Sequence, residues 1–178
     1  MKNIKYHPIY LFFLLFLAGC ATIPKSTKQD SSLGETLEKK IVIGVLPFQN
    51  LSNDKNYDWL SLGIAESLTT ALAGNKRLKI VERLQIDKVK EELAFGLDDL
   101  ADLKAAQEMG KELGCNFTIT GSFQILKGKI KVDARMIKSE TGIIGGSEGV
   151  SVSVTGKVED IFGLYEKLAK ELLKTLNK

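Results

Sequence analysis

Apolar and polar positions predict a strand, a helix and a second strand early in the chain. Residues 41–46 form a short apolar run closed by Pro47, which is typical of a strand buried on both faces. Apolar residues then recur at helical spacing, at Leu60, Ile64, Leu68, Ala71 and Leu72. We expect Asp58 to cap this helix, Gly74 to end it and residues 78–81 to form the second strand. This order predicts a βαβ unit with two parallel strands.

Two shorter helices are predicted downstream of this unit. Apolar residues at helical spacing over residues 86–93 indicate a helix that follows Glu82, and those over residues 103–113 indicate a second one. We expect the cap of the second helix to come from residues 98–102, because this stretch is rich in aspartate.

The pattern then changes to strict alternation, which predicts an antiparallel meander of three strands. Residues 116–125 and 129–136 alternate apolar and polar side chains, and a tight turn at residues 127–128 joins them. A turn at residues 140–142 leads to a third strand through residues 150–154. We expect each strand to place one face on the core and the other in water.

The end of the chain contains the clearest amphipathic helix. Its apolar residues share one face, which comprises Val158, Ile161, Phe162, Tyr165, Leu168, Ala169, Leu172 and Leu176. We expect this stripe to pack on the sheet. The predicted fold class is therefore α/β: a βαβ unit is extended by an antiparallel three-strand meander, and helices, including the C-terminal amphipathic helix, cover the mixed sheet.

The start of the chain predicts a targeting signal. Lys2 and Lys5 precede an apolar run over residues 9–18, which is shorter than the roughly 20 residues that span a bilayer. We interpret residues 1–19 as a secretory signal peptide. Residues 20–40 are polar and without apolar periodicity, and we interpret them as a flexible tether to one domain at residues 41–178.

The leader ends in four residues that resemble the lipobox of bacterial lipoproteins: Leu17, Ala18, Gly19 and Cys20. The resemblance implies that the signal peptidase recognises the first three and that Cys20 carries fatty acyl chains such as palmitate. A protein acylated at one residue is anchored to a membrane without crossing it. Ala21, in place of an aspartate, implies the outer membrane.

Composition without the leader excludes several function classes. The chain has 25 Lys plus Arg and 22 Asp plus Glu, and loss of Lys2 and Lys5 leaves 23 − 22 = +1, so we expect no nucleic-acid partner. The one histidine, His7, lies in the leader, which excludes histidine-based catalysis and histidine-containing metal sites. We expect no enzyme activity, cofactor or metal. Cys115 has no partner cysteine, and we expect a buried, unreactive thiol.

The domain contains eight short segments whose order and spacing are informative: residues 45–52, 59–66, 80–83, 110–114, 120–122, 134–135, 140–142 and 159–162. Together these segments resemble the CsgG-type lipoproteins, including the LpoB-type activators, and the related TolB N-terminal-like domain. The resemblance implies an α/β domain on the periplasmic face of the bacterial outer membrane that binds other envelope proteins. Members export curli subunits through a ringed pore or stimulate a peptidoglycan synthase.

The loop at residues 47–58 is the candidate partner surface, because ligands of parallel sheets meet the carboxyl ends of the strands. The candidate residues are Phe48, Asn50, Asn53, Tyr57, Asp58 and Trp59. The alternative is that Phe48 and Trp59 cover the edge of the core while the polar residues form turns.

Three functions remain open from the sequence. A periplasmic binding or assembly lipoprotein is favoured, because it needs no chemistry that the sequence lacks. A ring-forming subunit of a curli-type secretion channel, and hence a homo-oligomer, is the second. A hydrolase that uses carboxylates alone is the third. Residues 129, 131, 133 and 135 are charged, so we expect that the protein does not form a channel by itself.

Overall fold

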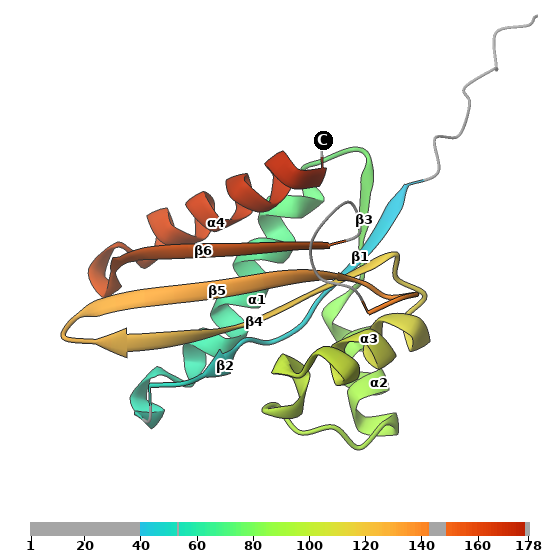
Figure 1. The fold of residues 1–178 in the computed structure, drawn as a ribbon, viewed down its shortest axis with the longest axis horizontal. Coiled ribbons are helices and arrows are strands. Elements are labelled where there is room, and N and C mark those ends of the chain that lie inside the picture. The colour runs from blue at the N-terminus through green and yellow to red at the C-terminus, as the bar shows by residue number, and fades with distance from the viewer. Residues whose placement is uncertain (1–39, 53, 143–148, 177–178) are drawn as a thin grey trace, which may run out of the picture. The chain divides into compact units, whose positions relative to one another are not determined.

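A six-stranded mixed sheet runs through the domain (Figure 1). The computed structural model describes residues 40–52, 54–142 and 149–176. The strands are β1 (Ile41–Val45), β2 (Gln49–Asn50), β3 (Leu78–Ile80), β4 (Phe117–Leu126), β5 (Lys129–Lys138) and β6 (Gly149–Lys157). Their order is β3-β1-β4-β5-β6, and β2 pairs with β4. The predicted mixed sheet is confirmed.

The parallel half of the sheet is the predicted βαβ unit. β1 pairs in parallel with β3, where Ile43 lies opposite Ile80, and with β4, where Ile43 lies opposite Phe117. Helix α1 (Trp59–Ala73) makes the crossover between β1 and β3. The other half is the predicted meander, because β4, β5 and β6 pair antiparallel in sequence order.

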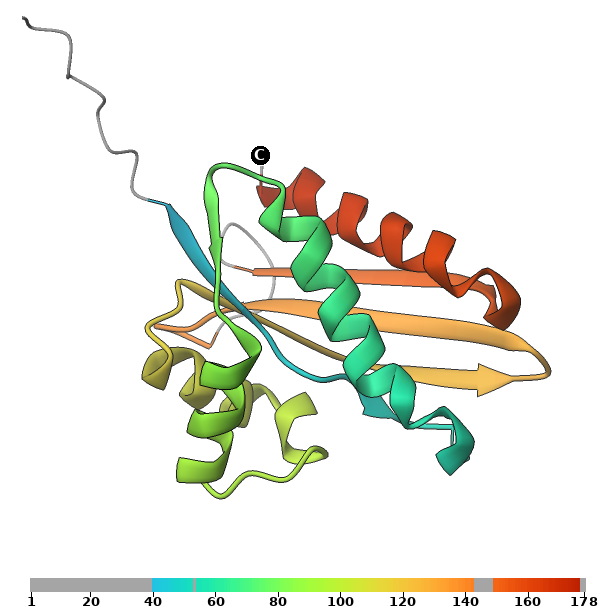
Figure 2. The same ribbon diagram turned by 180° about the vertical axis from the view of Figure 1, so that it is seen from behind.

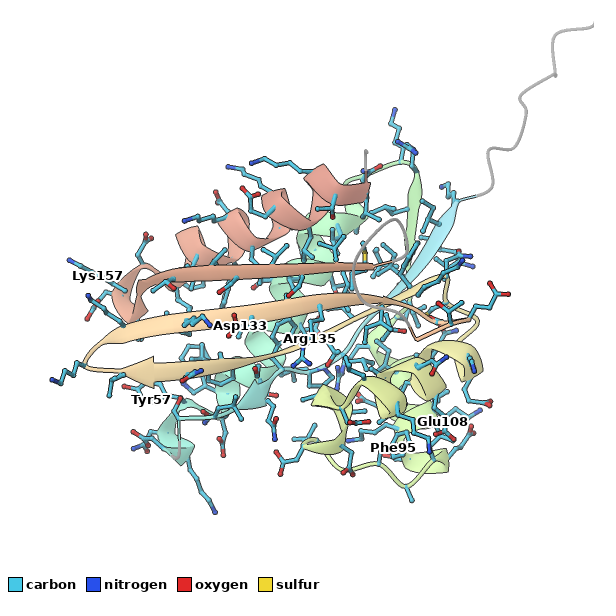
Figure 3. The ribbon with its side chains drawn as sticks, in the orientation of Figure 1. Tyr57, Phe95, Glu108, Asp133, Arg135 and Lys157 are labelled. Atoms are coloured by element: carbon cyan, nitrogen blue, oxygen red, sulfur yellow. The ribbon has the colours of Figure 1, made fainter. Side chains whose placement is uncertain are left out.

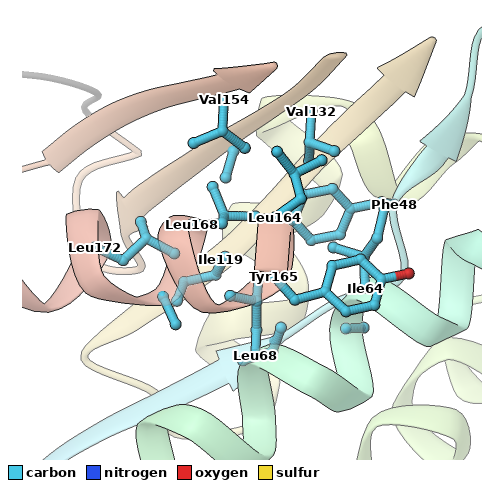
Figure 4. Packing of buried hydrophobic residues seen from close by; sticks show 14 of the residues in the cluster. Phe48, Ile64, Leu68, Ile119, Val132, Val154, Leu164, Tyr165, Leu168 and Leu172 are labelled. Atoms are coloured by element: carbon cyan, nitrogen blue, oxygen red, sulfur yellow. The ribbon is translucent and has the colours of Figure 1, made fainter. Parts of the chain in front are cut away.

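Helices α1 and α4 (Ile161–Leu176) cover one face of the sheet (Figure 2). Between them and the strands lies the larger core (Figure 4). Its fully buried members include Ile43, Leu60, Ile64, Leu68, Ile119, Phe123, Val132, Leu168 and Leu172. These residues come from β1, α1, β4, β5 and α4, so the hydrophobic effect holds the βαβ unit and the meander together.

Helices α2 (Arg83–Glu92) and α3 (Leu103–Glu112), with the 3-10 turn η3 (Asp99–Ala101), pack on the opposite face at one end of the sheet. The side chain of Asp102 accepts hydrogen bonds from the backbone N–H groups of Lys104 and Ala105, so the predicted cap of α3 is confirmed. Among the described residues, no helix combines the length and apolar character needed to cross a bilayer.

Strand β4 differs from its prediction because it is buried on both faces. Its polar side chains Thr118 and Thr120 are fully buried, although the alternation predicted that they face water. The hydroxyl of Thr118 bonds to that of Ser139 at 3.1 Å, and Thr120 donates to the backbone carbonyl of Leu100. Buried hydroxyls are tolerated when they are hydrogen bonded, so η3 and α3 can cover this face.

The alternation holds on β5, whose polar face remains uncovered. Lys129 and Lys131 are exposed, and Asp133 and Arg135 lie half-buried on the side away from α1 (Figure 3). The ammonium of Lys131 pairs with Asp133 at 3.0 Å. Exposed pairs of this kind contribute little to stability, so they mark a solvated surface.

The C-terminal helix also departs from the prediction at one residue. The segment begins with a 3-10 turn, η4 (Val158–Asp160), and α4 buries residues 161, 164, 165, 168, 169 and 172. This stripe follows helical spacing from Ile161, so Phe162 turns away from it and is 77% exposed. The expectation that Phe162 packs on the sheet is wrong.

Candidate partner-binding surface

The segment after β1 places Phe48 in the core, so this residue does not belong to the predicted surface. Leu46 donates its N–H to the carbonyl of Ile119 at 2.8 Å, which continues the pairing with β4 beyond β1. Phe48 follows, and its side chain is 1% exposed. Its ring fits beside Gly121 of β4, where the absence of a side chain leaves the space. For Phe48 the alternative interpretation, a cover for the core, is the correct one.

The next residues, 49–52 and 54–58, are hydrogen bonded to one another instead of forming the open loop that the sequence predicted. We call these residues the arch. β2 pairs with β4, and the turn η2 (Lys55–Tyr57) follows it. The Nδ2 of Asn50 donates to the carbonyl of Asp54 at 3.0 Å and to Oδ1 of Asp58 at 2.8 Å. The Oδ1 of Asn50 accepts from the N–H of Ser52 at 2.9 Å. Asn50 therefore links both ends of the arch.

The side chain of Asp58 accepts a hydrogen bond from Asn50 within this arch and does not cap α1. Its side chain accepts no hydrogen bond from the helix, and its backbone is already in the helical region at φ −59° and ψ −28°. The predicted side-chain cap is therefore wrong, because a capping side chain needs an extended backbone to reach back to the N–H groups. Asn53 lies outside the described residues, as do Leu17, Ala18, Gly19 and Cys20.

An acidic pocket of about 460 Å³ opens between the arch and the segment before η3. Three carboxylates, those of Asp54, Asp58 and Asp98, line it together with one ammonium, that of Lys55. Gln49 reaches across it, because its Nε2 donates to Asp98 at 3.5 Å. The lining of the pocket therefore has a net negative charge, which favours a ligand or partner that presents a cationic group.

The aromatic residues at the start of α1 divide between core and surface. Tyr57 is half-buried and packs against the larger core, between the sheet and helices α1 and α4. Trp59 is 60% exposed, and its role at a partner surface stays a prediction. Trp59 lies one turn before Gly63, and its ring atoms Cε3 and Cζ3 lie 3.8 Å from the place that a Cβ of Gly63 would take.

A second helix extends this surface. The Tyr165 hydroxyl lies 3.6 Å from the same point above Gly63, so Trp59 and Tyr165 approach each other across the α1–α4 contact. The ring of Phe162 stands edge-on to that of Tyr165, with centroids 6.2 Å apart. We call the strip formed by Trp59, Gly63, Tyr165 and Phe162 the aromatic strip.

A groove of about 400 Å³ lies between α1 and α4 next to the aromatic strip. Phe162 and Tyr165 line it on one side, and Glu66 and Glu166 add a carboxylate from each helix. Tyr165 is buried and its hydroxyl has no hydrogen-bond partner. Burial raises the pKa of this phenol to about 12. The surface therefore combines the exposed ring of Phe162 with carboxylates, and the unpaired hydroxyl of Tyr165 lies buried beneath it.

Sequence reasoning missed Phe162 as a surface residue. The spacing from Ile161 through Leu164 and Leu168 already defines a complete apolar stripe without it, and that signal was available in the sequence. No group of three or more His, Cys, Asp or Glu side chains is arranged to hold a metal ion in the part of the chain that the structure describes.

The burial predicted for Cys115 is confirmed. Its side chain is buried and forms no disulfide, and its sulfur lies 3.1 Å from the place that a Cβ of Gly44 would take. Burial raises the pKa of this thiol to about 11, against a smaller lowering by a hydrogen bond with the Gly44 backbone.

A sequence model described as "Curli production assembly/transport component CsgG" matches residues 25–126, which is more than half of the chain. The protein belongs to the CsgG family. The match includes β1, the arch, α1 and β4 of the CsgG-family domain, so both the pocket and the Trp59 end of the aromatic strip lie in it. Phe162 and Tyr165 lie beyond it.

Solved structures share the fold of this CsgG-family chain. The LpoB C-terminal domain from Salmonella enterica is 20% identical, with a TM-score of 0.52 over 67% of this chain and 84% of that one. Lipoprotein GNA1162 from Neisseria meningitidis is 15% identical, with a TM-score of 0.52 over 77% and 96%. TolB from Acinetobacter baumannii is 11% identical, with a TM-score of 0.51 over 77% of this chain and 28% of that one.

One curated relative resembles the chain in sequence. "Putative adenylate cyclase 3" of Rhizobium meliloti (strain 1021) is 26% identical over 140 residues, which are 79% of this chain and 22% of that protein. The chain thus spans about a fifth of the length of this relative.

Proposed function

We propose that this CsgG-family protein is an envelope lipoprotein, anchored through Cys20 to the periplasmic face of the outer membrane, that binds another envelope protein. It thereby supports an assembly, secretion or peptidoglycan-synthesis machine. Membership of the family and the lipobox-like residues 17–20 support this proposal. The proposed role rests on binding and needs no histidine chemistry, since His7 is the only histidine of the chain and lies in the proposed leader.

The aromatic strip is the observation that carries the proposed binding role. Large rings are enriched at the centres of protein interfaces, and Trp59 and Phe162 are both exposed and both border the buried Tyr165. Glu66 and Glu166 border the groove, and the acidic pocket lies before the start of α1. The partner segment therefore presents apolar side chains together with lysine or arginine.

Crosslinking in intact cells tests this proposal. Trp59→Ala and Phe162→Ala each remove one exposed ring, and we expect each to lower the yield of the crosslinked partner about tenfold, because interface aromatics dominate binding energy. The melting temperature should change little, because neither side chain is buried.

One exposed leucine supplies a matched control. Leu84 on α2 is 81% exposed, and α2 packs on the face of the sheet opposite α1 and α4. Leu84→Ala should leave the yield unchanged. Unaltered capture by the Trp59 and Phe162 variants, or an equal loss in the Leu84 variant, would contradict the proposed surface.

A ring-forming subunit of a secretion channel is the second candidate, because the matching family is described by curli assembly and transport. Planar bilayers with the lipidated protein distinguish the two. Discrete conductance steps would support the channel subunit, and ion-tight bilayers would support the binding lipoprotein.

A further inference from the structure

Strand β6 is an edge of the sheet that lacks the usual protection against pairing. It contains nine residues, all in continuous register with β5. It has no proline, and its one charged side chain, Lys157, stands at its last position. The other edge, β3, has three residues with the exposed Lys79 at its centre. Short strands and central lysines prevent an edge from pairing with another strand, so β3 is protected against such pairing and β6 is not.

The hydrogen-bond pattern shows which residues of β6 face outward. The N–H of Val158 donates to the carbonyl of Gly128 at 3.0 Å, toward β5. Such bonds occur at every second pair of an antiparallel ladder, so Val154 and Val152 also bond to β5. The backbone groups of the alternate residues, Ser151, Ser153 and Thr155, therefore point away from the sheet.

We propose that β6 pairs antiparallel with β6 of a second copy of this chain, about a two-fold axis at Ser153. This register uses every outward-facing residue, because Ser153 is the midpoint of the strand. Ser153 then lies opposite Ser153 of the second copy, and Ser151 lies opposite Thr155 of the second copy. Each such pair exchanges two backbone hydrogen bonds, and the two sheets become one continuous sheet.

The charges of the strand favour a second copy as the occupant. With the axis at Ser153, Lys157 lies opposite Gly149 of the second copy, so no like charges meet. An axis at Lys157 would place two lysines opposite each other. The strand is therefore self-complementary in this register, as an isologous interface requires.

The apolar face of the sheet continues across the same pair. Val152 lies opposite Val154 of the second copy, and both side chains lie on the face of the sheet that packs against the larger core. Branched side chains opposite each other stabilise antiparallel strands. α4 packs on β6, so the α4 helices of the two copies run antiparallel over this side. The acidic start of one, Glu159 and Asp160, then faces the basic end of the other.

Cysteine crosslinking of the full-length chain tests both the pairing and its register. All variants carry Cys115→Ala, and the parent with this change alone controls for Cys20. Ser153→Cys should form a disulfide-linked dimer on mild oxidation, because directly opposite residues have Cα atoms about 5.5 Å apart. Ser151→Cys alone and Thr155→Cys alone should not, since each is separated from its own copy by about 13 Å. An equal mixture of these two variants should crosslink.

A charge variant supplies an independent test. Ser153→Lys places two lysines at the axis and should weaken dimerisation at least about tenfold in sedimentation equilibrium. Gln85→Lys adds the same charge on an exposed site of α2 and should leave the dimer unchanged. A monomer at all concentrations, or crosslinking of Ser151→Cys equal to that of Ser153→Cys, would overturn the proposal.

Discussion

Gly121 of β4 lies directly against the ring of Phe48, so that a Cβ on the glycine would lie 2.6 Å from Cε1 of Phe48. The same Cβ would collide with the backbone carbonyl of Asp133 on β5, which cannot rotate away. The close approach explains how the segment between β1 and β2 turns a large ring into the sheet. It also fixes the start of the arch that carries Asn50.

Gly121→Ala should lower the free energy of unfolding by about 2–3 kcal/mol, because the extra methyl forces the backbone of β5 or the ring of Phe48 to move. Urea unfolding followed by circular dichroism measures this change. Gly74→Ala is the control, because a Cβ there has an ordinary contact of 3.7 Å with a backbone oxygen. Its effect should stay within about 0.5 kcal/mol. Equal effects at the two glycines would contradict the close packing.

Two aspartates that precede helices should differ in their contribution to stability. Asp102 accepts two backbone N–H groups of α3, so Asp102→Ala should lower the free energy of unfolding by about 1 kcal/mol. The side chain of Asp58 accepts none from α1 and instead forms a solvent-exposed hydrogen bond with the half-buried Asn50, so Asp58→Ala should cost less than about 0.5 kcal/mol. Chemical denaturation of both variants decides the order, and a larger loss for Asp58→Ala would show that the arch is structurally more important.

Cys115 should make stability fall in alkaline solution. Its pKa is raised from 9.0 to about 11 in the folded state, so between these pH values the unfolded chain has lost the proton that the folded chain retains. The unfolded state binds fewer protons in this window, and the free energy of unfolding therefore decreases as pH rises. The contribution of Cys115 is complete below pH 9 and is lost by about pH 11.

Cys115→Ala should remove this contribution, so its stability should decline less steeply than that of the unaltered protein over the same pH range, by up to roughly 2 kcal/mol. The comparison of slopes separates Cys115 from Tyr165, whose pKa is also raised and which both proteins share. Identical slopes would mean that the thiol is not desolvated. Alkylation of Cys115 at neutral pH should be slow in the folded protein and fast after unfolding.

Cys20→Ser should abolish the proposed lipid anchor. Without the thiol there is no acyl acceptor, so the variant should lack the acyl mass in intact-protein mass spectrometry and leave the membrane fraction. The parent protein should carry the acyl mass at Cys20. An unacylated parent, found in the cytosol with residues 1–19 attached, would contradict the anchoring proposal.

Local patterns predicted most of the fold because helical and strand periodicity reflects which face of each element is buried. The βαβ unit and the meander followed from residue spacing, and the capping role of the segment before α3 followed from its aspartates. β2 was missed, because a strand of two residues contains no periodicity. Within the candidate surface, Phe48 is buried and the partner role of the exposed Trp59 stays a prediction, whereas the exposed Phe162 was assigned to the core.

The sequence by itself determined the order and type of the main elements, the apolar face of each helix and the burial of Cys115, since these depend on residues close together in the chain. Only the tertiary structure decided that β4 is covered on both sides, that Asp58 accepts a hydrogen bond from Asn50 and that Trp59 and Phe162 both border Tyr165. These relationships join residues from different elements. They depend on which neighbours satisfy a hydroxyl or leave room for a ring, and no local pattern contains that information.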